Sequence, residues 1–398
     1  METDSKKVLY IGRIGLPDDA PSIRVYNNSC ILHKLGYKVD ILCLKRNDTD
    51  STYSSYSDWL RYFFVSPPNT RKPSFLKKIG NLFEPIFNIK AKSQVKHQIQ
   101  ISNPSIVITY NDLLFSSVFL KRYCRRKGIK LISDVTEWYE KRPLQKNIAN
   151  YLVPVLTDYR IRYIDRGIGN IIAISPYLKD YYLSQNCNVL FLPPVFEIIP
   201  PKNIEKHHYY KEHVINFIYA GSPGNKDILL PFIESVVKIN SNGLKIRLDI
   251  FGITESYLSS FSGFAENPNE YGVIFHGKVK HSEIIPYLER ADFGVLLRHE
   301  LRYAKAGFST KFAECMLYGV AMFANKVGGA ESIIENKKDG IIIDDAAVPT
   351  IIDQLTKIYD MSEKDLLQLR KNAAIKAAEL FVSTNYDDKF LNFLNCLR

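Results

Sequence analysis

Strand-like and helix-like segments alternate along this chain in two separate series, and this alternation limits the possible fold more than any other feature. In the first series, apolar segments at residues 8–12, 38–44 and 106–110 are separated by helical segments. Such alternation is typical of parallel sheets covered by helices on both faces. A second series of the same kind starts near residue 215. We therefore predict an α/β chain with two doubly wound, Rossmann-like domains and a central cleft.

A segment rich in proline and charge separates the two series. It reads IIPPKNIEKHHYYKEH over residues 198–213, a composition typical of linkers. We predict an N-terminal domain at residues 1–198 and a C-terminal domain at 199–384. The final helix, at about residues 385–398, is expected to pack back on the first domain. Residues 45–102 are expected to be a polar and aromatic insertion.

The net charge of +11 is unevenly distributed along the chain. Residues 1–200 carry 29 Lys and Arg against 17 Asp and Glu, a net charge of +12, whereas the remainder carries −1. The excess gathers in two runs, at residues 71–80 and 121–130, and aromatic residues flank the first run. Basic residues among aromatics suit an anionic membrane surface. A solvated basic face is the alternative, and no signature of nucleic-acid binding is present.

Several classes of protein are disfavoured by the composition. No run of 18 apolar residues indicates a transmembrane helix, and the polar start does not resemble a secretory signal. The six cysteines are scattered without a C-x-x-C spacing, which indicates a reducing compartment and no structural zinc. We expect a cytoplasmic protein that needs neither a metal nor a cofactor.

One stretch carries a strong indication of a ligand site. It reads STKFAECMLYGVAMFANKVGGAESI over residues 309–333 and predicts a helix, a strand, a glycine turn and a second helix. Lys311 lies in the first turn of the first helix, where a cation is unfavourable unless an anion is also present. Glu314, one turn further, is an acceptor suited to the paired hydroxyls of a ribose. We predict a diphosphate site at Ser309, Thr310, Lys311, Glu314, Gly328 and Gly329; a plain Lys–Glu helical pair is the alternative.

Further candidates follow other predicted strands. For the diphosphate they are Gly221, Ser222 and Lys226 in IYAGSPGNKD, and Arg298 at the end of DFGVLLR. A guanidinium suits paired phosphate oxygens, although Arg298 could instead pair with Glu300 or Asp292. In the first half, Asp134 and Glu137 are candidates to position a substrate hydroxyl or to take its proton. The remaining candidates for the cleft are Ser22, Arg24, Tyr110, Asn111 and Trp138.

An ordered series of motifs resembles a known family. The segments AISPYLKDYY, LPPV, IYAGSPGNKD, ADFGVLLR, GFSTKFAECMLYGVAMFANKVGGAESI and DGIIID together resemble retaining glycosyltransferase family 4, the glycosyl transferases group 1, of GT-B fold. STKFAE is closer to the polysaccharide-assembly type. The chain departs from the pattern at Ala306, where the family has a glutamate, and at Thr136, where many members have a histidine. The family's Gly-Gly after the first strand is also missing.

The resemblance implies metal-independent transfer of a sugar, with retention, from a nucleoside-diphosphate-sugar donor. The acceptor would be a saccharide or lipid-linked saccharide, in bacterial surface polysaccharide or glycan biosynthesis. With the basic first half, it implies a cytoplasmic enzyme bound peripherally to the inner face of the membrane. Two alternatives remain: a catalytically degenerate partner subunit of the same fold, motivated by the missing family residues, and a nucleotide-sugar epimerase.

Overall fold

The chain forms two compact α/β units. A computed structural model describes residues 6–16, 19–44, 53–64, 89–140, 148–197, 204, 214–224, 226–259 and 267–398. Contacts within the chain divide it into unit 1, Met1–Glu197 with Ser383–Arg398, and unit 2, Ile198–Val382. The basic run at residues 71–80 and most of the predicted linker lie outside the described residues.

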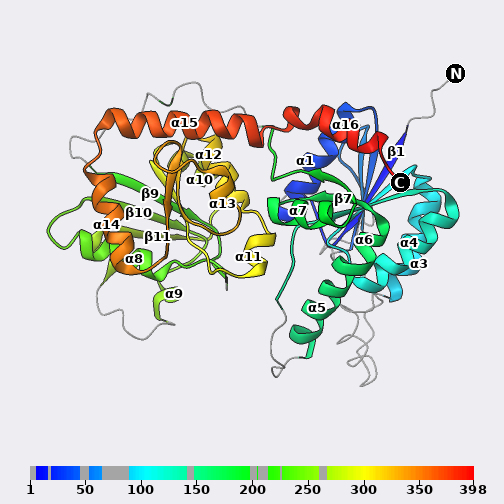
Figure 1. Cartoon of the computed structure of the whole chain (residues 1–398), viewed down its shortest axis with the longest axis horizontal. Coiled ribbons are helices and arrows are strands. Elements are labelled where there is room, and N and C mark those ends of the chain that lie inside the picture. The colour runs from blue at the N-terminus through cyan, green and yellow to red at the C-terminus, as the bar shows by residue number, and fades with distance from the viewer. Residues whose placement is uncertain are drawn as a thin grey trace. The chain divides into compact units, whose positions relative to one another are not determined.

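Unit 1 is built on a sheet whose described strands follow the order β3-β4-β2-β1-β5-β6-β7-β8 (Figure 1). Neighbouring strands are parallel except β3, which pairs antiparallel with β4. The strands are β1 (Lys7–Gly12), β2 (Lys38–Cys43), β3 (Tyr53–Ser55), β4 (Leu60–Phe64), β5 (Ile106–Tyr110), β6 (Lys130–Val135), β7 (Asn170–Ala173) and β8 (Asn188–Phe191). The predicted insertion at 45–102 thus contributes two strands to the sheet. Arg61 of β4 donates from Nε to Oδ1 of Asp40, in the neighbouring strand β2, at 2.7 Å. This ion pair gives the buried carboxylate of Asp40 a partner.

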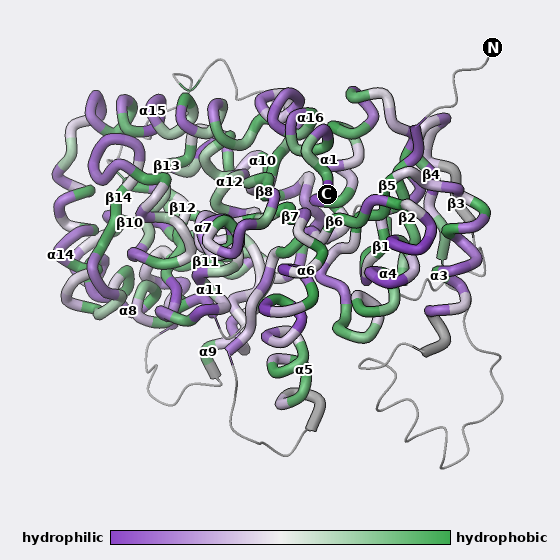
Figure 2. The backbone as a smooth tube through the Cα atoms, turned by 45° about the vertical axis from the view of Figure 1, so that its right-hand side comes forward, coloured by the Kyte–Doolittle hydropathy of each residue, from purple (hydrophilic) through white to green (hydrophobic). Residues whose placement is uncertain are grey.

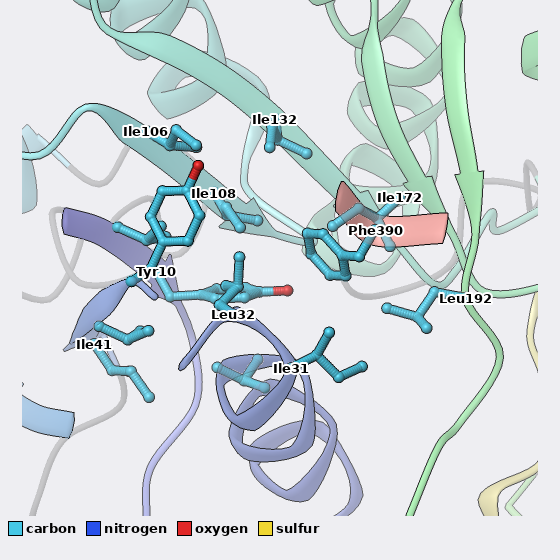
Figure 3. Close-up of a cluster of buried hydrophobic side chains, with 14 of the residues drawn as sticks. Tyr10, Ile31, Leu32, Ile41, Ile106, Ile108, Ile132, Ile172, Leu192 and Phe390 are labelled. Atoms are coloured by element: carbon cyan, nitrogen blue, oxygen red, sulfur yellow. The ribbon is translucent and has the colours of Figure 1, made fainter. Parts of the chain in front are cut away.

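Helices cover both faces of this sheet. They are α1 (Ala20–Lys34), α3 (Ile89–Ser102), α4 (Leu114–Lys127), α5 (Ile148–Tyr159), α6 (Arg166–Ile168), α7 (Pro176–Ser184) and α16 (Asp387–Asn395), with a π-helical segment, Arg160–Asp165, joining α5 to α6. Alternate residues of β1 enter two cores: Tyr10 belongs to one cluster and Leu9 to the other. Phe390 of α16 lies in the first cluster with Ile31 and Ile172 (Figure 3). The end of the chain therefore completes a core that its beginning started.

Unit 2 contains a parallel sheet whose described strands follow the order β11-β10-β9-β12-β13-β14. These strands are β9 (Ile215–Ala220), β10 (Ile246–Phe251), β11 (Val273–Gly277), β12 (Phe293–Leu296), β13 (Ala321–Asn325) and β14 (Gly340–Ile343). The order reverses between β9 and β12, as in doubly wound nucleotide-binding sheets. The predicted fold class is thus confirmed in both units.

The helices of unit 2 differ widely in length. They are α8 (Leu230–Ile239), α9 (Ser256–Ser259), α10 (His281–Leu288), α11 (Arg302–Ala306), α12 (Thr310–Leu317), α13 (Ala330–Ile333), α14 (Val348–Tyr359) and α15 (Glu363–Phe381). Figure 2 shows hydrophilic and hydrophobic residues alternating along α14 and α15. The predicted sequence of helix, strand, turn and helix over residues 309–333 is confirmed as α12, β13, a turn at Gly328-Gly329 and α13.

Candidate functional site

The candidate site lies at the carboxyl ends of β9 and β12, where the strand order of unit 2 reverses. In sheets of this kind, ligands bind at this position because the connections leave the edge in opposite directions. The end of β9 supplies Tyr219 and Gly221, the chain after β12 supplies Arg298, and the first turn of α12 supplies Lys311. Three elements of the predicted donor site therefore meet at one edge.

A carboxylate joins these elements, and we had not predicted it. Asp227 Oδ2 accepts hydrogen bonds from Lys311 Nζ at 3.0 Å and from the Tyr219 hydroxyl at 2.8 Å. Its Oδ1 accepts one from Arg298 Nε at 3.0 Å. Burial acts to raise the pKa of Asp227, but the charges of Lys311 and Arg298 outweigh it and lower that pKa overall. Asp227 thus stays ionised and holds two cations in place.

Lys311 is the cation of this group that reaches solvent. About a quarter of its side chain (26%) is exposed, against 3% for Arg298. Its Nζ also donates to the Tyr219 hydroxyl at 3.1 Å and lies 4.2 Å from the centre of that ring. Since an ammonium has three donors and these two acceptors use two, a third can serve an anion. A Cβ on Gly221, whose φ is +132°, would lie 3.0 Å from this ammonium, so the glycine leaves room for it.

Arg298 does not lie as we predicted. Arg298 is buried in its ion pair with Asp227, rather than pairing with Glu300 or Asp292 or facing an open edge. Its backbone exchanges two hydrogen bonds with the Asn325 side chain, which fixes the turn after β12. Lys226 Nζ lies 4.8 Å from the centre of the Tyr303 ring of α11. Arg298 therefore adds positive potential from beneath the site, and Lys311 is the better placed for direct contact.

Glu314 lies one turn beyond Lys311 and contacts a histidine that the sequence had not singled out. Its Oε1 is hydrogen-bonded to Nε2 of His281, the first residue of α10. The Glu314 side chain is 16% exposed and the His281 side chain 57% exposed. The hydrogen bond with Glu314 raises the pKa of His281. The carboxylate is thus accessible but held in one orientation.

Glycines keep the strand ends of this edge free of side chains. Gly221, Gly252 and Gly277 follow or end β9, β10 and β11, and all three have positive φ. A Cβ on Gly252 would lie 2.7 Å from the carbonyl carbon of Gly221, so neighbouring strand ends are in backbone contact. At the predicted turn, Gly328 and Gly329 have φ of +73° and +83°. Gly221, Gly252, Gly277 and Gly329 are partly exposed at this edge, whereas Gly328 is buried.

The remaining predicted donor residues surround Lys311. Ser309 is the N-cap of α12 and accepts a hydrogen bond from Phe312 N at 3.4 Å. Thr310 is partly exposed in the first turn of α12, and Ser222 is exposed in the loop after β9. Thr310 directly precedes Lys311, and Ser222 directly follows Gly221. Each therefore adds a polar group near the ammonium of Lys311.

In unit 1, two predicted residues form part of the core. Arg24 and Asp134 make an ion pair of 2.9 Å, with 5% and 0% of their side chains exposed. The Tyr10 hydroxyl also donates to Asp134, at 2.5 Å. Arg24 donates to the carbonyl of Leu192 as well. This interior position corrects our expectation that Arg24 meets a phosphate and that Asp134 takes a proton, because neither group is open to a ligand.

Ser22 and Trp138 are also interior. Ser22 accepts a hydrogen bond from Gly15 N and donates to Asp19, so it orders the start of α1. Trp138 is 2% exposed, and its indole N–H donates to Asp158 at 2.9 Å. The structure therefore gives both residues structural contacts in place of the expected contact with an acceptor.

Three predicted residues of unit 1 remain partly exposed at the strand ends: Tyr110, Asn111 and Glu137. The Asn111 side chain accepts from the Thr136 backbone N–H at 2.9 Å, and Thr136 Oγ1 donates to the Tyr110 hydroxyl at 3.2 Å. Glu137 contacts the hydroxyl of Tyr139. Glu137 is thus the carboxylate of the predicted pair that a substrate could approach.

No group of His, Cys, Asp or Glu side chains among the described residues has the arrangement of a metal site. Among the described helices, none combines the length and the hydropathy needed to cross a bilayer.

Comparisons with known proteins agree with this description. Residues 214–361 match the sequence model of the family glycosyl transferases group 1. No curated protein sequence is significantly similar to the chain. Among similar solved structures, sucrose-phosphate synthase from Thermosynechococcus elongatus has a TM-score of 0.71 and 14% identity, with 98% of each chain covered. HepE from Anabaena, in complex with UDP, has a TM-score of 0.66 and 13% identity, with 98% of this chain and 100% of HepE covered. The lipopolysaccharide outer core galactosyltransferase WaaB has a TM-score of 0.57 and 13% identity, with 98% of this chain and 99% of WaaB covered. Residues 214–361 are thus similar in sequence to the glycosyl transferases group 1, and over nearly its whole length the chain has the GT-B fold of these two-domain structures.

Proposed function

We propose that the chain is a glycosyltransferase that takes its sugar from a nucleoside-diphosphate-sugar bound at the carboxyl edge of the unit 2 sheet. The observation that carries the proposal is Lys311, a partly exposed cation at the start of α12, held by Asp227 and Tyr219 beside bare glycine backbone. A helix N-terminus with a lysine in its first turn favours anions. HepE, of the same fold, has been solved with UDP and with UDP-glucose, which supports this class of donor.

The charges of the site favour an anion. Arg298, Lys311 and Lys226 supply three positive charges against the two carboxylates of Asp227 and Glu314, which leaves an excess of one. The diphosphate of a nucleotide sugar carries two negative charges. Fixed positive groups stabilise the leaving diphosphate as the bond to the sugar breaks, and this needs no metal.

The ribose and the acceptor are assigned to other groups. Glu314, oriented by His281, accepts hydrogen bonds from the ribose hydroxyls. In unit 1, Glu137 takes the proton of the acceptor hydroxyl, and Tyr110 and Asn111 line its path. The proposed acceptor is a saccharide or lipid-linked saccharide of a bacterial surface glycan, reached at the cytoplasmic face of an anionic membrane. The family resemblance supports retention of configuration.

The test is a thermal-shift screen of nucleoside diphosphates and their sugars. A ligand that binds only the folded chain raises its melting temperature in proportion to the logarithm of its concentration. We expect one base to stabilise the protein most, equally with EDTA and with magnesium. Stabilisation by none of the nucleotides, or only in the presence of magnesium, would contradict the proposed phosphate site.

A second candidate is a degenerate subunit that binds the donor without turnover. Ala306, at the position of a family glutamate, is completely buried in α11, so it leaves no carboxylate there. Slow hydrolysis of the bound nucleotide sugar in water would favour the enzyme. Donor binding without any release of sugar, with a range of saccharide acceptors, would favour the degenerate subunit.

A further inference from the structure

Three polar side chains of unit 1 form a continuous series of hydrogen bonds at the carboxyl ends of β5 and β6. Tyr110 is the last residue of β5, Asn111 follows it, and Thr136 follows β6. We call these three residues the relay. The strand order of the unit 1 sheet reverses between β1 and β5, so the relay begins at the point where sheets of this kind bind their ligands.

The direction of each hydrogen bond in the relay follows from its first member. The Thr136 backbone N–H can only donate, so the Asn111 atom that it contacts at 2.9 Å is the amide oxygen. The other amide atom is therefore the nitrogen, which donates to Thr136 Oγ1. Thr136 has one hydroxyl proton, and it donates this proton to the Tyr110 oxygen at 3.2 Å. The Tyr110 oxygen thus accepts within the relay and keeps its own proton free.

The Tyr110 proton is available to a ligand. Nothing else in the described part of the chain accepts it. Thr136 is 4% exposed, so the opposite direction of the last bond would bury a threonine proton without a partner. Tyr110, in contrast, is partly exposed. The relay therefore satisfies the interior polar groups and leaves a phenolic donor at the edge of the sheet.

The ring of Tyr110 is held in place by its neighbours. A Cβ on Gly12, the last residue of β1, would lie 2.9 Å from Cβ of Tyr110, so the glycine lets the tyrosine pack against the adjacent strand. The ring also packs against the apolar cluster that contains Tyr10. Burial raises the pKa of Tyr110, so its hydroxyl stays protonated near neutral pH. The charge of Glu137 acts on this hydroxyl, so the donor and the carboxylate belong to the same edge.

The backbone of Asn111 has a conformation that few residues other than glycine adopt. Its φ is +42°, in the left-handed region. Its backbone N–H donates to the Asp134 carbonyl at 3.0 Å, and its side chain makes both bonds to Thr136. These three bonds hold the residue in its strained conformation. Strain that is retained beside an exposed donor is typical of a functional site.

We propose that Tyr110 contacts the acceptor directly: its hydroxyl donates a hydrogen bond to the attacking hydroxyl oxygen of the acceptor saccharide. Thr136 and Asn111 are positioning residues, which fix the direction of that bond. The bond occupies one lone pair of the attacking oxygen, leaves the other for the sugar carbon, and turns the acceptor proton toward Glu137. This inference rests on the proposed function, and it gives a role to Thr136, where many members of the family have a histidine.

The test is hydrolysis of the nucleotide sugar that stabilises the chain most, with water in place of the acceptor hydroxyl. The water oxygen bonds to the sugar, the bond from the sugar to the diphosphate breaks, and Glu137 receives the proton. Tyr110→Phe should lower the rate constant about ten-fold and leave the dissociation constant of the nucleoside diphosphate unchanged. Tyr177→Phe is the matched control, since it removes an exposed hydroxyl from the start of α7 at the same edge, and it should hydrolyse as wild type.

The positioning residues are tested by reversing the relay. In Asn111→Asp, the carboxylate accepts both the Thr136 backbone N–H and the Thr136 hydroxyl proton, so Thr136 Oγ1 can only accept from Tyr110. The Tyr110 proton then points inward, and the attacking oxygen loses its donor. We expect the same loss as in Tyr110→Phe, about ten-fold, and no further loss in the double variant.

Variants of Thr136 complete the series. Thr136→Val removes the hydroxyl that directs Tyr110 and should lower the rate constant about five-fold, whereas Thr136→Ser keeps the hydroxyl and should hydrolyse nearly as wild type. Thermal denaturation establishes that each variant is folded.

The possible failures are distinguishable. Wild-type rates in folded Tyr110→Phe or Asn111→Asp would overturn the inference and leave the proposed function intact. Losses that multiply in the double variant would overturn the relay, because two independent defects behave in this way. Weaker nucleotide binding by Tyr110→Phe would assign the hydroxyl to the donor instead of the acceptor. If wild type released no sugar to water or to a range of saccharides, the proposed enzyme would be refuted and the inference would fall with it.

Discussion

Lys311 is held by its neighbours in a position that an unconstrained lysine would rarely occupy. Asp227 and Tyr219 each accept one of its hydrogen bonds, and the start of α12 would otherwise disfavour a cation. Burial lowers the pKa of Lys311, and Asp227 opposes that effect. The residue is therefore prepared to receive an anion before the anion arrives.

We expect Lys311→Ala to weaken binding of the preferred nucleoside diphosphate by ten-fold or more, about 1.4 kcal/mol. Lys311→Arg should retain part of the affinity, because it keeps the charge but not the geometry. Isothermal titration calorimetry measures both, with Lys364→Ala as the control for a lost surface charge. Unchanged affinity in folded Lys311→Ala would remove this lysine from the site.

The pair of His281 and Glu314 gives a prediction that depends on pH. Because Glu314 raises the pKa of His281, the pair adds stability that is fully present below the unfolded pKa of about 6.5 and is lost as pH rises through the folded value. NMR titration should show that the pKa of His281 in the folded chain lies above the value of about 6.5 that histidine has in an unstructured peptide. In Glu314→Gln it should return toward about 6.5. An identical titration in both proteins would show that the contact does not persist in solution.

At the scale of elements, the carboxyl edge of the unit 2 sheet depends on contact between backbones. The ends of β9 and β10 approach so closely at Gly221 and Gly252 that no side chain fits between them. A residue other than glycine would also be strained at these positive φ values.

Gly252→Ala should therefore destabilise the chain by about 2–4 kcal/mol, from backbone strain together with overpacking. Gly243→Ala is the matched control, since Gly243 also has positive φ but nothing within 4 Å of an added Cβ. It should cost only the strain, about 1–2 kcal/mol. Urea denaturation measures both, and equal losses would show that the close contact contributes nothing.

The elements could largely be predicted from the sequence, whereas the contacts between side chains could not. Hydrophobic periodicity predicts strands and helices because it is local, and the first turn of α12 identifies Lys311. The bonds of Asp227 to Lys311 and Arg298 join residues 84 and 71 positions apart, and Arg24 is 110 positions from Asp134. A polar residue at a strand end can turn toward solvent or into the core, and only the tertiary structure decides which.

At the scale of the whole molecule, the two units have opposite roles in our proposal, and their charges differ accordingly. The first half of the sequence carries the entire positive excess, and the family match falls within the second. Donor binding should thus be a property of unit 2.

Hydrogen exchange of the full chain can test this division. The nucleoside diphosphate that stabilises the protein most should slow exchange at the starts of α10 and α12 and in the turn at Gly328-Gly329. At Tyr110, Asn111 and the neighbouring loop of unit 1, exchange should stay the same until an acceptor is added. Protection confined to unit 1 would show that the nucleotide binds there, and the prediction that unit 2 binds the donor would be wrong.

Unit 1 is interrupted in sequence: its sheet is complete by Phe191, yet α16 arrives only after all of unit 2. On the ribosome, the first domain to emerge is consequently the last to be finished. Its partial core at Ile31 and Ile172 lacks Phe390, Phe393 and Leu394 until all of unit 2 has been synthesised. During that interval the nascent chain exposes apolar surface that invites chaperones. A message truncated after the codon for Val382 would yield a complete unit 2 attached to a unit 1 whose core lacks α16.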